Sequence, residues 1–149
     1  MRAVIQRVSK ASVHVGEELV GEVDRGLLVL LAAGHSDTAE TADWCVRKVV
    51  GLRIFEDSAG KMNLDVRDVG GRLLVVSQFT LYGDCRKGRR PSFVNAAKPE
   101  QASALVDLFV EKARAAGVEC QTGRFRKTMD VSLVNHGPVT ILIDSEKQF

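Results

Sequence analysis

The chain has 149 residues, of which 45% are hydrophobic and 27% charged, as in an ordinary globular protein. This length fits a single domain over residues 1–149, and the longest apolar stretch, residues 26–34, is far too short to cross a bilayer. The formal net charge of +2 is too small to indicate nucleic-acid binding by itself. The distribution of charge along the chain must therefore decide that question.

The first residues and the cysteines both indicate a cytoplasmic protein. The segment MRAVIQRVSK alternates apolar and polar residues and lacks the apolar centre of a signal peptide, so we expect it to be the first strand. Cys45, Cys85 and Cys120 are odd in number and widely spaced, which favours a reduced compartment over a disulfide framework or a zinc site. The three histidines are isolated, so we predict no metal and no cofactor.

Strand patterns dominate the chain. Apolar residues alternate with polar ones near the N-terminus, whereas residues 27–32 are apolar throughout, as in a strand buried on both faces. Turn residues separate the individual runs. The predicted strands span residues 3–15, 19–23, 27–32, 52–56, 72–81, 118–121, 128–134 and 139–143.

Two segments have the apolar spacing of an amphipathic helix. The first is capped by Ser36 or Asp37 and ends near Gly51. The second begins at Pro99, a favoured residue in a first turn, and ends before Gly117. Because strands outnumber helices and flank both of them, we predict a mixed sheet with helices packed on it.

The segment Ser77 to Leu81 lies at the end of a buried strand. Hydroxyl groups and main-chain N–H groups can emerge together at such a rim, and N–H groups of this kind can stabilise an oxyanion. The alternative is a strand that turns polar simply because it reaches the surface.

The Gly137–Pro138 pair interrupts two strand-like runs. Proline cannot donate to a strand ladder and is the one residue with a readily accessible cis peptide bond. A cis bond here would turn the neighbouring carbonyl oxygens in an unusual direction. The alternative is a plain hairpin turn.

Residues 82–98 form a long irregular segment, and loops of this length in small domains are usually functional or disordered. The segment holds Arg86, Lys87, Arg89 and Arg90, the main concentration of cations in the chain. Phosphate is their natural partner, although a solvated basic loop would have the same composition. Cys85 beside them could be an activated thiolate, but no base partner is evident.

Three segments together resemble the D-aminoacyl-tRNA deacylase family. They are MRAVIQRVSKASV at the start, VSQFTLYGDCRKGRRPSF followed by NAAKP in the middle, and MDVSLVNHGPVTILID near the end. The resemblance runs essentially from end to end. It implies an α/β mixed fold of the α+β type, with a largely antiparallel, barrel-like sheet and two main helices packed on it.

The resemblance also implies a homodimeric hydrolase that cleaves the ester of D-aminoacyl-tRNA during chiral proofreading. Gly137 and Pro138 would then be a cis pair that reaches into the other subunit and excludes L-amino acids by steric contact. Such a filter should admit glycyl-tRNA as well, because glycine has no side chain to exclude. Arg7 is expected to anchor this pair through its carbonyl groups, and Met129 to line the pocket.

Within the same resemblance, the N–H groups of Phe79 and Thr80 would polarise the ester carbonyl, and Ser77 and Gln78 would shape the adenosine pocket. The favoured mechanism uses the ribose 2′-OH of the substrate to help activate water. Thr80 as a nucleophile is the second choice, because no residue of the motif is set to activate it.

The cations Arg86, Lys87, Arg89 and Arg90 are expected to contact the tRNA backbone. The chain departs from the family pattern at Arg126 and Lys127, where small residues are common, and at His136, where an acid is common. We expect the first departure to strengthen backbone contacts, and the second removes a negative charge beside the filter. Two other functions stay open: a non-catalytic tRNA-binding module, and a small-molecule hydrolase or thiol enzyme that uses Cys85.

Overall fold

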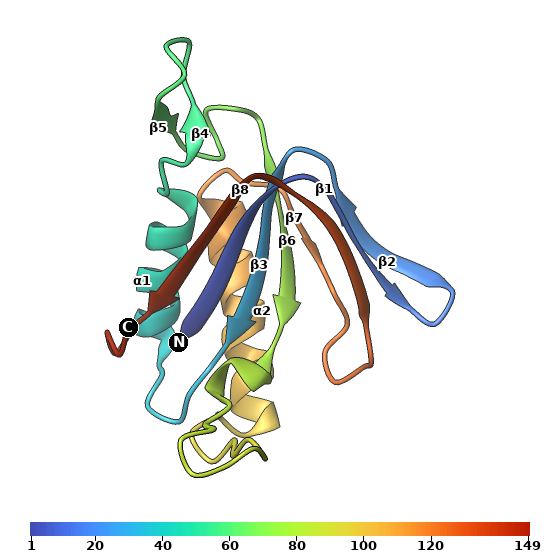
Figure 1. Cartoon of the computed structure of the whole chain (residues 1–149), viewed down its shortest axis with the longest axis vertical. Coiled ribbons are helices and arrows are strands. Elements are labelled where there is room, and N and C mark those ends of the chain that lie inside the picture. The colour runs from blue at the N-terminus through green and yellow to red at the C-terminus, as the bar shows by residue number, and fades with distance from the viewer.

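A curved six-stranded sheet forms the body of the molecule in the computed structural model, which describes residues 1–149 (Figure 1). The strand order is β2-β1-β3-β6-β7, and β8 pairs with the other edge of β1. A separate hairpin, β4-β5, projects from one end (Figure 1). The elements are β1 (Arg2–Val15), β2 (Glu18–Val23), β3 (Gly26–Ala32), α1 (Ala39–Val50), β4 (Phe55–Glu56), β5 (Met62–Leu64), β6 (Arg72–Ser77), the 3-10 turn η1 (Phe79–Tyr82), α2 (Pro99–Ala115), β7 (Cys120–Thr122) and β8 (Asp130–Asp144).

The long strand β1 makes the sheet curve. Its first half pairs with β3 and its second half with β2, while β8 follows its opposite edge along the whole length. At the far side β2 comes back close to β7, where a Cβ atom on Gly21 would lie 2.7 Å from the Thr122 carbonyl oxygen. Glycine is therefore required at this close approach. The sheet is nearly closed, which confirms the predicted barrel-like core.

Side chains alternate between two apolar cores. Leu27, Val29 and Leu31 of β3 belong to the larger core, together with the buried faces of α1 and α2. Leu28 belongs to the smaller core, which lies on the concave side of the sheet. Both helices cover the same face of the sheet (Figure 1). The mixed α/β fold and its two predicted helices are thus confirmed, and no helix is long and apolar enough to span a membrane.

Two predictions near α1 were wrong in detail. The strand predicted over residues 52–56 is reduced to Phe55–Glu56, because only these residues find a partner, in β5. The cap of α1 is Thr38, whose N–H donates to the Thr41 hydroxyl at 3.1 Å, rather than Ser36 or Asp37. The carboxylate of Asp37 is occupied elsewhere, since it accepts the Gly34 N–H at 2.7 Å.

The strand predicted over residues 72–81 stops at Ser77. Ser77 pairs with Leu31, close to the end of β3, so the sheet offers little to continue the ladder. The chain instead turns into η1, where the Leu81 N–H donates to the Gln78 carbonyl at 3.1 Å. The polar half of the motif therefore lies on a turn at the rim of the sheet.

The two strands predicted over residues 128–134 and 139–143 form one strand, β8. Its register with β1 shifts as it passes the Gly-Pro pair: Asn135 is opposite Val8, and Thr140 is opposite Gln6. Residues 136–139 therefore bulge out of the ladder without ending it. A strand with an internal bulge, rather than a hairpin turn, carries Gly137 and Pro138.

Candidate active site

A cavity of about 750 Å³ opens at the carboxyl ends of β3 and β6. These two strands are parallel neighbours, and the carboxyl ends of parallel strands are a common place for ligand sites. Most of the lining is hydrophobic, with a few polar groups at the edge. The lining residues are Leu31–Ala33, Val76–Phe79, Phe93, Ala96–Pro99, Ala102, Val106, Phe125–Met129 and Val131.

The turn after β6 forms one wall of this cavity. Ser77, Gln78 and Phe79 line it, and Met129 lines it from the loop between β7 and β8, so four of the predicted site residues are brought together. In a 3-10 turn the first N–H groups have no partner inside the turn, which leaves those of Phe79 and Thr80 available to an acceptor at the rim. Phe79 is 56% exposed, and its ring packs edge to face against the Phe93 ring, with the two ring centres 5.1 Å apart.

The Thr80 side chain does not line the cavity. Its hydroxyl oxygen accepts a hydrogen bond from the side-chain amide of Gln78. An amide N–H donates to this oxygen and cannot take its proton. The structure places no histidine, lysine or carboxylate in hydrogen-bond contact with the Thr80 hydroxyl.

Arg2 holds the far end of the turn. Its guanidinium donates to the Leu81 carbonyl at 3.1 Å and lies 4.5 Å from the centre of the Tyr82 ring. The Tyr82 hydroxyl reaches Asp37 at 3.4 Å, so the turn is tied to the start of α1 as well. Burial raises the pKa of Tyr82 above its usual value, and the charge of Asp37 adds to the effect. These contacts keep the turn in a fixed position relative to the cavity.

The Gly137–Pro138 peptide bond is cis and lies away from this cavity. Gly137 has φ +140°, and a Cβ atom there would lie 2.7 Å from a Val139 methyl carbon and 2.8 Å from an Arg7 nitrogen. The position therefore requires glycine. Arg7 is buried and donates to the His136 carbonyl at 2.8 Å, which is the contact expected of an anchor.

A second residue that anchors the Gly-Pro bulge, Asn135, was not predicted from the sequence. Its side-chain oxygen accepts the Val139 N–H at 3.0 Å, and its amide donates to the Thr140 hydroxyl at 3.1 Å. The side chain thus bridges the two ends of the bulge. An asparagine two residues before a glycine in a strand is the available signal, because its short amide can bond to nearby backbone.

In one chain the two motifs are at opposite ends of the sheet. Arg7, beside the Gly-Pro bulge, pairs with Leu27 at the start of β3, whereas the cavity begins at Leu31 near the end of β3. Four residues of strand separate them by about 13 Å along the strand direction. A single subunit therefore cannot present both motifs to one small ligand.

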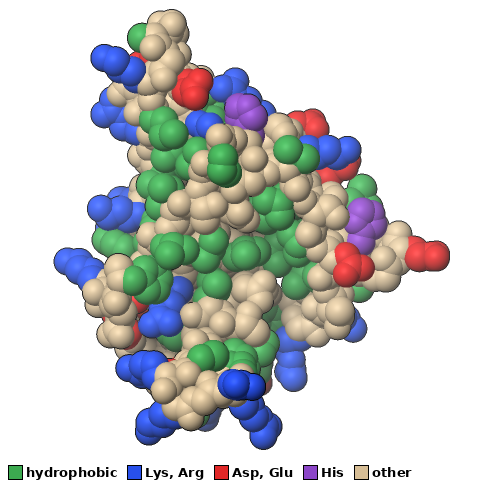
Figure 2. Space-filling model, in the orientation of Figure 1, with side chains coloured by type: hydrophobic (Ala, Val, Ile, Leu, Met, Phe, Trp, Pro, Cys, Tyr) green, Lys and Arg blue, Asp and Glu red, His purple; other side chains and the backbone are tan.

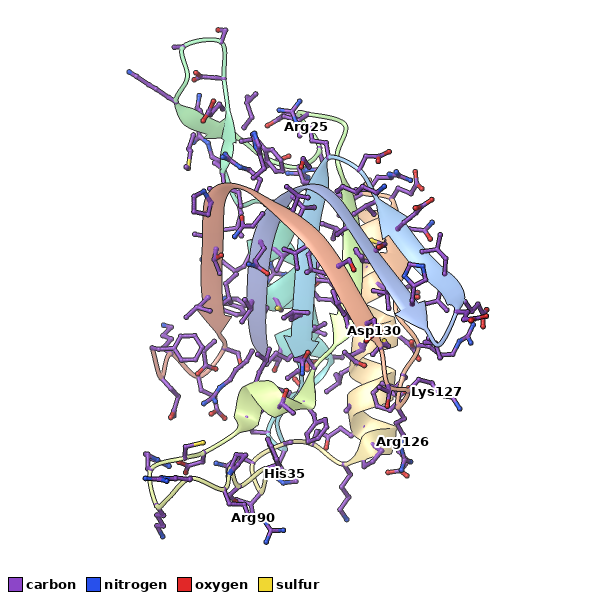
Figure 3. The ribbon with its side chains drawn as sticks, turned by 45° about the vertical axis from the view of Figure 1, so that its right-hand side comes forward. Arg25, His35, Arg90, Arg126, Lys127 and Asp130 are labelled. Carbon is purple, nitrogen blue, oxygen red and sulfur yellow. The ribbon has the colours of Figure 1, made fainter.

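The basic loop extends beyond the cavity, and Figure 3 shows Arg90 at its far end. Arg86 is engaged with Asp84, with a nitrogen–oxygen distance of 2.6 Å, and this contact holds the pKa of the Asp84 carboxyl well below its usual range. Lys87, Arg89 and Arg90 are exposed and form no ion pair. Three of the four predicted cations are free to meet an anion.

The cysteines give no support to thiol chemistry. Cys45 and Cys120 are buried, and burial raises the pKa of Cys45 to about 12 and that of Cys120 to about 11. Cys85 is exposed, but the cavity lining does not include it. No group of three or more histidine, cysteine or acidic side chains is arranged to hold a metal ion.

The family model described as D-Tyr-tRNA(Tyr) deacylase matches residues 4–144. This chain belongs to that family. Two curated relatives named D-aminoacyl-tRNA deacylase, from Thermotoga petrophila and Clostridioides difficile, are 59% and 57% identical over 149 residues, and the matches cover the whole of both chains.

Solved structures share the fold of this deacylase-family chain. A protein described as c-Myc DNA unwinding element binding protein is 40% identical, with a TM-score of 0.91 over 97% of this chain and 99% of the other. A probable eukaryotic D-amino acid tRNA deacylase is 20% identical, with a TM-score of 0.84 over 95% and 97%, and shows likeness of fold alone.

Proposed function

We propose that this chain is a homodimeric D-aminoacyl-tRNA deacylase whose site combines the cavity of one subunit with the Gly137–Pro138 bulge of the other. Family membership supports the general reaction: the chain is a hydrolase that acts on the ester bond of aminoacyl-tRNA. The observation that carries the rest is the position of the Ser77–Phe79 turn at the rim of the cavity. The cavity volume falls within the range of small-molecule sites, about 300–1,000 Å³.

In the proposed reaction, water attacks the ester carbonyl carbon. The carbon–oxygen bond to the ribose breaks, the ribose oxygen takes up a proton, and a free D-amino acid and tRNA are released. The N–H groups of Phe79 and Thr80 stabilise the negative charge that develops on the carbonyl oxygen. Ser77, Gln78 and Met129 hold the terminal adenosine against the cavity wall. The protein needs neither a metal nor an organic cofactor for these steps.

The substrate's own 2′-OH assists the attacking water. This mechanism is favoured over a Thr80 nucleophile because the side-chain partner of the Thr80 hydroxyl is the Gln78 amide, which cannot act as a base. Thr80→Ala tests it. We expect hydrolysis within about tenfold of the wild-type rate, since the backbone N–H is retained. Near-complete loss of turnover with intact substrate binding would instead favour a Thr80 nucleophile.

Selection for D-amino acids is assigned to the bulge. Its carbonyl groups hold the α-amino group of the substrate, and an L side chain would be driven into the rigid Gly137–Pro138 backbone. Glycine lacks a side chain, so glycyl-tRNA is also a substrate. His136 adjoins this filter, and its carbonyl oxygen is fixed by Arg7.

A second copy of the chain is proposed on the sheet face that the helices leave open. Leu142 of β8 is 56% exposed there, because its neighbours Ile141 and Ile143 point to the opposite face and pack on the larger core. Figure 2 shows hydrophobic side chains over the centre of this face. The separation of the two motifs within one chain supports the dimer, because a second subunit can supply the motif that one subunit cannot bring to the cavity.

The tRNA backbone is contacted by the basic loop, through Arg86, Lys87, Arg89 and Arg90. The reaction takes place in the cytoplasm, where charged tRNA is used.

The decisive experiment is hydrolysis of matched D- and L-tyrosyl-tRNA, with glycyl-tRNA as a third substrate. We expect rapid release of D-tyrosine and glycine and slow release of L-tyrosine. Equal rates for both enantiomers would contradict the filter. Tight binding of all three without hydrolysis would favour the non-catalytic tRNA-binding module.

A further inference from the structure

Three cations line the mouth of the cavity: Lys98 at the start of α2, and Arg126 and Lys127 in the loop between β7 and β8. We call them the cationic rim. All three are exposed, and no aspartate or glutamate belongs to the cavity lining. Figure 3 shows Arg126 and Lys127 beside the same end of α2. The mouth of a largely apolar cavity therefore carries positive charge, and no acidic residue of the lining balances it.

The rim cations are uncommitted, in contrast to their neighbours. Arg124 in the same loop forms an ion pair with Glu18 at 2.8 Å. None of the three rim cations forms an ion pair or a side-chain hydrogen bond within the chain. Asp130 is close in sequence, but it neither lines the cavity nor pairs with the rim. Exposed cations with no partner in the protein are available to an anionic ligand.

Arg126 also occupies an unfavourable backbone position. Its φ is +59°, in the left-handed region that glycine adopts freely and that costs other residues about 1–2 kcal/mol. Strain of this kind is retained where the side chain or its placement has a use. The position therefore favours a role for the guanidinium at the cavity mouth.

The cavity and the cationic rim together indicate which kind of ligand fits. An apolar cavity with a cationic mouth fits a molecule that has a flat, largely apolar end and negative charge directly beside it. A terminal nucleotide has this form, because its base can enter the cavity while the phosphate that links it to the preceding nucleotide stays outside.

We propose that Lys98, Arg126 and Lys127 hold the phosphodiester groups of the single-stranded 3′ end of tRNA. This proposal rests on the proposed function and adds a second phosphate site to it. The rim fixes the terminal nucleotides at the cavity, whereas the loop of residues 86–90 contacts the tRNA further away. Arginine and lysine are the residues that recognise phosphate through charge-assisted hydrogen bonds.

The test compares two substrates that differ only in the nucleotides, and hence the phosphates, that precede the terminal adenosine. One is the D-tyrosyl ester of adenosine, which has no phosphate, and the other is the D-tyrosyl ester of the trinucleotide CpCpA. For the double variant Arg126→Ala/Lys127→Ala we expect kcat/KM to fall about tenfold on the trinucleotide ester, mainly through KM, and to be unchanged on the adenosine ester. For the trinucleotide ester, log kcat/KM should also fall less steeply with log salt concentration. The slope should become shallower by about 0.7 for each phosphate that the variant no longer neutralises.

A matched control removes the same charge elsewhere. The double variant Arg47→Ala/Lys48→Ala, on the exposed side of α1, should have the wild-type kcat/KM on both substrates. Equal losses on both substrates, or the same loss in the control, would overturn the proposal. If the wild-type protein cleaves neither ester, the rim is judged by binding of unacylated CpCpA against adenosine; the proposed function itself fails only if D-tyrosyl-tRNA is not hydrolysed either. Tighter trinucleotide binding that the rim variant abolishes would support the rim, and equal binding by the variant would refute it.

Discussion

The carboxylate of Asp37 contacts several segments that support the active-site turn, so we expect its removal to lower the stability of the fold. The Asp37 side chain is 3% exposed and pairs with the Met1 ammonium group, which is fully buried. The same carboxylate accepts the Gly34 N–H at 2.7 Å and the Tyr82 hydroxyl at 3.4 Å. Asp37→Asn keeps the size of the side chain but leaves the ammonium group without a counter-charge.

Breaking a buried ion pair on one side typically costs about 3–5 kcal/mol. For a chain of this size the melting temperature should fall by about 6–20 °C. Urea unfolding of untagged protein, followed by circular dichroism, measures the free energy directly. The control is Glu18→Gln, which removes one exposed ion pair, with Arg124, and should cost far less, because exposed ion pairs contribute little to stability. Equal, small losses in both variants would refute the assigned role of Asp37.

Three further predictions concern the filter, the thiols and the turn. Gly137→Ala should lose about 1–3 kcal/mol of stability and most D-tyrosyl-tRNA hydrolysis, because φ is +140° and two atoms lie under 3 Å from the new Cβ; wild-type values in urea and turnover assays would contradict this. A thiol reagent at pH 8 should modify Cys85 alone in the native protein and also Cys45 and Cys120 in denaturant, since burial raises the pKa of both buried thiols. The raised pKa of Tyr82 predicts stability that is fully present below about pH 10 and is lost as the pH rises through the folded-state value. Tyr82→Phe should flatten that alkaline loss in unfolding titrations, and an unchanged slope would count against it.

The sequence predicted those parts of the fold whose signal is local. The apolar run of β3 and the spacing of Cys45 and Val49 in α1 each reflect burial of one short segment, and both segments are buried as predicted. The continuity of β8 is different in kind. It depends on pairing with β1, more than a hundred residues away, which carries the strand past the Gly-Pro bulge.

The candidate site divides in the same way. The polar turn after β6 could be located because it follows directly from a buried strand in the sequence. The presence of Lys98 and Phe125 in the cavity lining could not be predicted, because the two residues meet only when α2 and the β7–β8 loop fold against the same strand ends. The partner-subunit role proposed for Gly137–Pro138 came from the family resemblance, because no pattern within one chain indicates it.

The central claim is that one active site takes its cavity from one chain and its filter from the other. Co-expression of two inactive variants with different tags tests it. Ala102→Trp fills the cavity from α2, and Gly137→Ala distorts the filter. Each heterodimer would contain one site with both wild-type halves, so purified heterodimer should recover about half of the wild-type D-tyrosyl-tRNA hydrolysis. Heterodimers as inactive as either parent would contradict the shared site.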